Sequence, residues 1–203
     1  MKPAFDLILF DLGGVLVDIS GSNETMQFMK QAVPATEFWR RWLYSSGVRA
    51  FESGQCDSEI FAARVVEELD LSVTPARFIE SFKQWVRGPF PGALELLEKL
   101  SAQISLGCLS NTNPHHWPLV SETMALGRYF KHPLISYQIG MMKPDAEIFE
   151  YAIKTTGHPP SRILFLDDND INVQSAQRCG LTALYVQGLE DAKTELKELG
   201  FAV

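Results

Sequence analysis

The chain has 203 residues, of which 46% are hydrophobic, enough for one substantial core or for a core with a small second domain. Its 18 basic and 25 acidic residues give a formal charge of −7, which argues against binding to nucleic acids or to an anionic membrane surface. The three cysteines, Cys56, Cys108 and Cys179, lack metal-ligand spacing, and no signal peptide is recognisable. We therefore expect a cytoplasmic protein with reduced thiols.

Short apolar runs that are typical of buried strands recur along the chain, and helical patterns separate the later ones. We predict strands at residues 6–10, 104–109, 134–136, 163–166 and 182–186. Helices are predicted over residues 91–100, 144–156 and 171–179, the last of them ending at Gly180. This alternation of strands and helices favours right-handed βαβ units, and hence an α/β fold with a parallel sheet.

Residues from about 20 to 88 interrupt this alternation. They show no strand pattern but contain amphipathic helices, such as 57–69, and aromatic residues that are spaced to pack a helical bundle. A helical insert at this place would lie over the sheet edge at which the first strand ends, so we interpret it as a lid. We divide the chain into a discontinuous core of residues 1–17 and 90–203 and a helical cap of residues 18–89.

Reactive or phosphate-binding groups follow a predicted strand or precede a predicted helix at four places: Asp11, Ser110-Asn111, Lys143 and Asp167-Asp168. In a parallel sheet all four would reach the carboxyl edge, where ligands bind. Two carboxylates that meet there need a proton or a cation, and Mg²⁺ with carboxylate and phosphate ligands fits that need. The Ser110 hydroxyl, N–H groups at a helix start and the charge of Lys143 suit a phosphoryl group.

In this order, the four motifs resemble those of the haloacid dehalogenase superfamily. The matching stretches are Asp11-Leu12-Gly13-Gly14-Val15, Leu109-Ser110-Asn111, Lys143-Pro144, and Phe165-Leu166-Asp167-Asp168 with Asn172. The resemblance covers essentially the whole chain. Within the superfamily the chain is most similar to bacterial phosphatases of the α-D-glucose-1-phosphate phosphatase type, and the phosphatase domain of soluble epoxide hydrolase is a more distant match. The resemblance implies a Rossmann-like three-layer core with a parallel sheet and an inserted α-helical cap.

The resemblance also implies an activity, a cofactor and residue roles. The chain would be an enzyme, a Mg²⁺-dependent phosphatase that hydrolyses a small phosphorylated metabolite, such as a sugar phosphate. Asp11 would be both the nucleophile that accepts the phosphoryl group and a metal ligand. Asp168 and the backbone carbonyl of Gly13 would complete the protein's metal ligands, and Asn172 would support them.

The remaining matched residues would act on the phosphoryl group. Ser110 and Asn111 would bind it, and Lys143 would neutralise it and orient the nucleophile. Asp167 would pair with Lys143. The sequence leaves open whether the protein is a monomer or a homodimer.

One position departs from the pattern of the family's phosphatases. They usually carry Asp where this chain has Gly13, and that Asp protonates the leaving group and then activates water. General acid–base catalysis is worth about 10²–10⁴-fold, or about 3–5 kcal/mol of barrier. His115 and His116 are candidate replacement proton sources, although such a pair more often lies on a partly exposed helix face.

Three interpretations follow from the glycine. We favour a phosphatase whose leaving group needs little protonation, such as an anomeric sugar phosphate or an acyl phosphate, or one in which another group or water replaces the acid. The second is a metal-independent 2-haloacid dehalogenase, but that chemistry gives no reason to keep Asp167 and Asp168 together. The third is a phosphate-binding or regulatory protein that has lost catalysis, against which the intact Asp11 and Lys143 argue.

Overall fold

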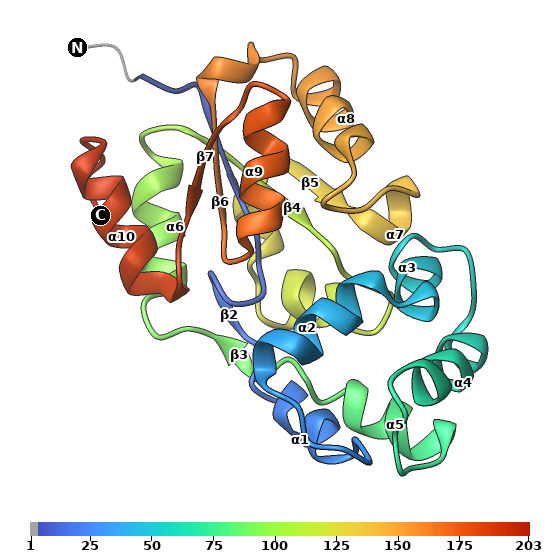
Figure 1. Ribbon diagram of the computed structural model, residues 1–203. Coiled ribbons are helices and arrows are strands. Elements are labelled where there is room, and N and C mark those ends of the chain that lie inside the picture. The colour runs from blue at the N-terminus through green and yellow to red at the C-terminus, as the bar shows by residue number, and fades with distance from the viewer. Residues whose placement is uncertain (1–3) are drawn as a thin grey trace.

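The computed structural model describes residues 4–203, so the first three residues of the predicted core segment 1–17 lie outside the described range. At its centre is a five-stranded parallel sheet in the order β5-β4-β1-β6-β7 (Figure 1). The strands are β1 (Leu7–Phe10), β4 (Ser105–Ser110), β5 (His132–Ile135), β6 (Ile163–Asp167) and β7 (Thr182–Tyr185). Each predicted strand is present, and the predicted α/β fold is confirmed.

Helices cover both faces of this sheet. They are α6 (Ala93–Ser101), α8 (Ala146–Thr156), α9 (Asp170–Arg178) and α10 (Gly188–Glu198). Because side chains alternate along a strand, the even-numbered residues of β1 join a buried cluster with α6 and α10, and the odd-numbered ones join a second cluster with α8 and α9. The core therefore has three layers. Of the four helices, α10 is additional to the predicted ones.

Between the two strands of a short antiparallel ribbon, the chain forms a group of short helices. The elements are β2 (Val17–Asp18), α1 (Ser22–Gln27), α2 (Ala35–Tyr44), α3 (Ser46–Glu52), α4 (Ser58–Glu68), α5 (Pro75–Phe82) and β3 (Gly88–Pro89). The β2–β3 pair was not predicted, because two residues per strand are too few for a periodic pattern.

These helices bury an aromatic-rich cluster of their own, separate from the two clusters around the sheet. Figure 1 shows them beyond the end of the sheet at which β1 leads into β2. We propose that residues 18–89 form the cap and that residues 1–17 and 90–203 form the core.

The other helical segments are short. They are a π-helical turn at Leu119–Thr123, α7 (Ser136–Ile139), and 3-10 turns at Gly127–Tyr129 and Pro160–Arg162. Within residues 4–203, no helix has both the length and the apolar character that a membrane span requires.

Candidate active site

Three polar side chains lie at the ends of three adjacent strands. Asp11 follows β1 directly, Ser110 is the last residue of β4, and Asp167 is the last residue of β6. Since β4, β1 and β6 are neighbours in a parallel sheet, the three side chains reach the same carboxyl edge. Ser110 and Asp167 are buried, and Asp11 lines a pocket with 14% of its side chain exposed.

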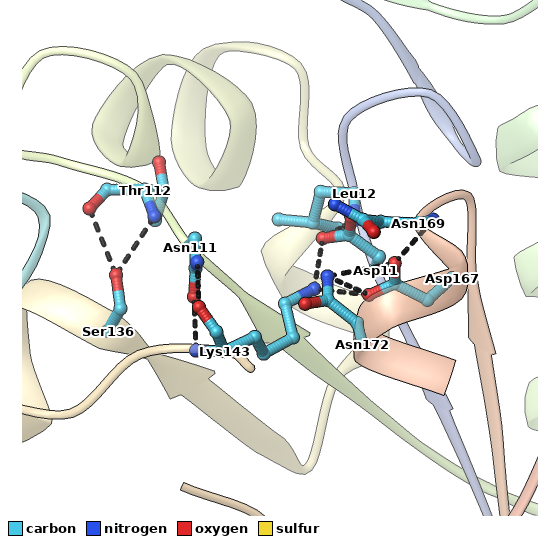
Figure 2. Close-up of polar contacts among 9 residues, drawn as sticks. All are labelled: Asp11, Leu12, Asn111, Thr112, Ser136, Lys143, Asp167, Asn169 and Asn172. Atoms are coloured by element: carbon cyan, nitrogen blue, oxygen red, sulfur yellow. Dashed lines mark hydrogen bonds and ion pairs between the residues drawn. The ribbon is translucent and has the colours of Figure 1, made fainter. Parts of the chain in front are cut away.

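Lys143 enters this edge from the loop before α8, and its ammonium is buried between two carboxylates (Figure 2). Its Nζ lies 2.6 Å from Oδ2 of Asp167 and 3.0 Å from Oδ1 of Asp11. Burial alone would lower the pKa of Lys143, but the charges of Asp11 and Asp167 raise it above its ordinary value. Lys143 is therefore held as a cation beside Asp11, since a buried ammonium needs such partners.

The Asn111 side chain holds the backbone of Lys143 in place. Its Nδ2 donates to the Lys143 carbonyl oxygen at 2.9 Å, and its Oδ1 accepts from the Lys143 N–H at 2.8 Å. The backbone of Thr112, the residue after Asn111, is also held by a side chain. Ser136 Oγ accepts from the Thr112 N–H at 2.9 Å and donates to the Thr112 carbonyl oxygen at 3.1 Å. Figure 2 shows both pairs of bonds, which fix the loop after β4.

Donors that line the pocket surround the Asp167 carboxylate. Besides Lys143, it accepts from Asn172 Nδ2, at 3.0 and 3.1 Å from its two oxygens, and from the Asn169 N–H at 2.8 Å. Asn172 therefore supports Asp167 directly. Its own Oδ1 is buried and has no hydrogen-bond partner among the described residues. Because its oxygens already accept these bonds, Asp167 is the partner of Lys143 and does not line the pocket.

Three carboxylates lie close together at this edge of the sheet. Oxygens of Asp11, Asp167 and Asp168 all lie within 4.8 Å of one another. Burial, partly offset by Lys143 and reinforced by Asp167, raises the pKa of Asp11 to about 6. Burial and the charges of Asp11 and Asp167 raise the pKa of Asp168 to about 8. The cluster thus carries more negative charge than Lys143 balances, which favours a bound cation.

Gly14 makes room for one of these carboxylates, a role that was not predicted from the sequence. Its φ is +75°, and a Cβ built there would lie 1.9 Å from Oδ2 of Asp168. Any other residue would therefore displace Asp168 from Asp11. The cradle and its all-oxygen donors fit a hard divalent cation, which Asp11, Asp168 and the Gly13 carbonyl would hold.

Gly13 lies beside an apolar side chain. A Cβ at this position would be 3.3 Å from both Cδ1 and Cγ2 of Ile19, the residue that follows β2. The heavy atoms nearest to such a Cβ thus all belong to Ile19, so a side chain at position 13 would press against hydrocarbon.

Asp11, Ser110, Lys143 and Asp168 form the polar floor of a cavity of about 670 Å³. Cap residues form the wall of this cavity. The wall includes Trp39, Trp42, Leu43, Val48, Glu52, Phe82 and Trp85. Most of these side chains are apolar, but Glu52 is a buried carboxyl. It ends α3, where the helix dipole disfavours a negative charge. An acid at the C-terminal end of an amphipathic helix is therefore the sequence signal that could have identified it.

The two histidines do not supply a proton donor to the pocket. In His116, Nδ1 accepts from Asn113 Nδ2 at 3.1 Å and Nε2 donates to the Phe82 carbonyl at 2.8 Å. Burial lowers its pKa to about 4, so the ring is neutral and joins the core to the cap. His115 is a partner of Ser58 on α4, and burial likewise lowers its pKa.

Comparisons with known proteins assign the chain to a family. Residues 5–180 match the family described as haloacid dehalogenase-like hydrolase. The D-ribitol-5-phosphate phosphatase of Bacteroides thetaiotaomicron is 28% identical over 200 residues, which cover 93% of this chain and 95% of that protein. The magnesium complex of a HAD family enzyme from the same organism is 25% identical, with a TM-score of 0.71 over 91% of this chain and 94% of that one.

The fold extends to enzymes with a different chemistry. The L-2-haloacid dehalogenase from Xanthobacter autotrophicus is 20% identical, with a TM-score of 0.66 over 98% of this chain and 85% of that one. The fold therefore does not separate phosphate esters from haloacids as substrates. Because the family match spans most of the described residues, the chain belongs to the haloacid dehalogenase-like hydrolases and is an enzyme of that family.

Proposed function

We propose that this protein is a Mg²⁺-dependent phosphatase that hydrolyses a small phosphorylated metabolite through a phospho-Asp11 intermediate. The observation that carries the proposal is the Lys143 ammonium, which lies 3.0 Å from Asp11 at the floor of a pocket that Ser110 and Asp168 also line. A phosphoryl group on this floor would meet a nucleophile, a cation and a hydroxyl donor together. The phosphatase name of the relative from B. thetaiotaomicron supports the same substrate class.

The chain's own residues would divide the work by position. An Asp11 carboxylate oxygen attacks phosphorus, and Lys143 and the Ser110 hydroxyl bind the equatorial oxygens, where charge is spread in the transition state. The Asn111 side chain is occupied by the Lys143 backbone, so we assign it a positioning role and leave phosphate binding to its backbone N–H. Asp167, braced by Asn172, keeps Lys143 charged and in place.

Asp11, Asp168 and the Gly13 carbonyl would hold the metal ion. When bound, Mg²⁺ would balance the surplus negative charge of the floor and of the substrate phosphate. The magnesium complex of the related HAD enzyme supports this choice of ion.

The substrate class is proposed at the level of sugar and polyol phosphates. The sequence was expected to lie closest to the glucose-1-phosphate phosphatases, but the comparisons support the superfamily and include a D-ribitol-5-phosphate phosphatase. A polyol phosphate leaves as an ordinary alkoxide, which needs a proton more than an anomeric oxygen does. The source of that proton therefore becomes a question about this site.

The test is a panel of phosphate monoesters, assayed with Mg²⁺ and with a chelator. We expect Mg²⁺-dependent release of phosphate, no turnover by Asp11→Asn, and a gain of one phosphoryl group on Asp11 in rapidly quenched wild-type protein. Asp70→Asn on the cap surface is the matched control and should keep wild-type rates. Undiminished hydrolysis by Asp11→Asn would overturn the proposal.

Gly13 favours one second candidate, a metal-independent 2-haloacid dehalogenase, since that chemistry needs no acid at this position. Turnover of 2-haloacids in the presence of a chelator, without turnover of phosphate esters, would support it. Binding of phosphate without turnover of either class would instead indicate a regulatory protein.

A further inference from the structure

Glu52 lies on the cap wall of the cavity that has Asp11 and Lys143 on its floor. It is the last residue of α3 and is only 7% exposed. Within residues 4–203, no hydrogen bond or ion pair joins its side chain to another residue. Buried polar groups normally have a hydrogen-bond partner, so a buried carboxyl without one in the proposed substrate cavity is available to bind the substrate.

The end of α3 is fastened to the core at two points. Arg49, one turn before Glu52, forms an ion pair with Asp145, two residues after Lys143. Gly54 packs so closely on the core that a Cβ there would lie 2.4 Å from the Tyr137 carbonyl oxygen. These contacts fix the end of α3 against the core, and Glu52 is thereby held in the wall of the cavity that Asp11 also lines.

The surroundings of Glu52 favour its protonated form. Burial, reinforced by the charge of Asp11 and partly offset by Lys143, raises its pKa to about 8. Asp168 and the neutral His116 line the same cavity. The helices α2, α4 and α7 pack against α3, and the Glu68 carboxylate of α4 is bonded at the opposite end of α3, to Ser45 and Ser46. The protonated form of Glu52 is thus favoured in the cavity that the nucleophile Asp11 also lines.

The direction of phosphoryl transfer favours a proton donor on the cap wall of the cavity, where the leaving oxygen needs its proton. In an in-line transfer the leaving oxygen departs on the side of phosphorus opposite to the attacking oxygen. Asp11 attacks from the floor, so the leaving oxygen points toward the cap. The position at which related phosphatases carry their acid is Gly13, and Ile19 fills the space beside it. Of the other acids near the cavity, Asp168 is assigned to the metal ion and Asp170 accepts from Gln174 Nε2. Asp18 accepts from the Ser20 N–H and does not line the cavity.

We propose that Glu52 is the general acid and base of the reaction, donating a proton from the cap to the leaving group; this rests on the phosphatase activity proposed above. As Asp11 bonds to phosphorus, the bond from phosphorus to the leaving oxygen breaks, and that oxygen keeps the electron pair and takes the Glu52 proton. Water then attacks the phosphorus of phospho-Asp11 and gives a proton to the Glu52 carboxylate. The Asp11–phosphorus bond breaks, and both carboxyl groups regain their starting states.

The test compares leaving groups. Wild-type protein, Glu52→Gln, Glu52→Asp and the control Glu59→Gln, an exposed acid of the same cap, are assayed with Mg²⁺ on D-ribitol 5-phosphate and on p-nitrophenyl phosphate. We expect Glu52→Gln to lower kcat/KM on the alkyl phosphate by about 10²–10⁴-fold. The loss should be much smaller on the aryl phosphate, whose leaving group needs little protonation. Glu52→Asp should retain part of the rate, and Glu59→Gln all of it.

Two results separate this inference from a structural role and from the proposed function. Equal losses on both substrates, or no loss, would overturn the acid role while leaving the phosphatase intact. Absence of hydrolysis by the wild-type protein across the whole panel of phosphate monoesters would overturn both. The pH profile gives a second readout, since the alkaline fall of wild-type kcat/KM on the alkyl phosphate should be missing from Glu52→Gln. Equal thermal unfolding midpoints of the variants near pH 6 exclude misfolding.

Discussion

The floor and the wall of the cavity are built in opposite ways. On the floor, polar groups are paired with one another, as when Lys143 contacts both Asp11 and Asp167 and Asn172 bonds to Asp167. On the wall, mostly apolar and aromatic side chains surround a carboxyl, Glu52, that has no partner among the described residues. A paired network holds reacting groups in one geometry, whereas an apolar wall changes the protonation of an isolated acid.

The largest effect is expected from loss of the Lys143 ammonium, which forms ion pairs with Asp11 and Asp167 on the floor. Lys143→Ala would leave Asp11 and Asp167 buried without a cation, at a cost of about 3–5 kcal/mol of unfolding free energy, and would abolish turnover. Urea unfolding measures the cost. The control Lys154→Ala, an exposed lysine on α8, should stay within about 0.5 kcal/mol of wild type. Equal losses in the two variants would mean that the floor is not held by this pairing.

The next effect tests how closely the floor is packed. Gly14→Ala forces a Cβ against the Asp168 carboxylate, whereas Gly140→Ala places one in open space at the same φ of +75°. Both variants should lose about 1–2 kcal/mol from the left-handed backbone. Gly14→Ala should lose about 1–3 kcal/mol more from the clash, and with it the affinity for Mg²⁺. Isothermal titration measures the affinity for Mg²⁺. Equal affinities of Gly14→Ala and Gly140→Ala would contradict the role of Gly14 in making room for Asp168.

A third prediction concerns protons and Mg²⁺ on the floor. The pKa values of Asp11 and Asp168 are raised to about 6 and about 8, so the folded metal-free protein keeps protons there that the unfolded chain releases above about pH 4. Its unfolding free energy should therefore fall as pH rises through this window. Mg²⁺ takes the place of those protons, so the stabilisation that it gives should grow from pH 5.5 to pH 8.

Thermal unfolding with Mg²⁺ and with a chelator measures this stabilisation, which reaches about 2.7 kcal/mol at an ion concentration 100 times the dissociation constant. Asp168→Asn should remove most of it. If the stabilisation by Mg²⁺ did not change with pH, Mg²⁺ would not be replacing protons on Asp11 and Asp168.

The smallest effect is expected where an acid is added to the floor at position 13. Gly13→Asp places a Cβ 3.3 Å from Ile19, which should cost about 1 kcal/mol of overpacking. Combining it with Ile19→Val removes one of the two crowded carbons and should recover part of that cost. A double-mutant cycle of unfolding free energies measures the coupling. A coupling of zero would show that Ile19 does not fill this space.

Local sequence pattern accounts for most of the core. The apolar runs before Asp11, Ser110 and Asp167 predict strands, because a strand buried on both faces needs continuous hydrophobic residues. Strand–helix alternation then predicts a parallel sheet, and the sheet brings its carboxyl ends to one edge. The meeting of Asp11, Asp167 and Lys143 therefore follows from the order of the motifs along the chain.

Only the tertiary structure decided the rest, since it depends on contacts between segments far apart in the chain. The pairing of β2 with β3 joins residues about 70 positions apart, and the approach of Asp168 that makes Gly14 necessary crosses the sheet edge. The structure also brought Glu52 to the cavity that Asp11 lines, and the Arg49–Asp145 ion pair joins its helix to the core. Position 13 shows the division most clearly. The sequence determined that an acid is missing there, and the fold showed which side of the cavity carries another.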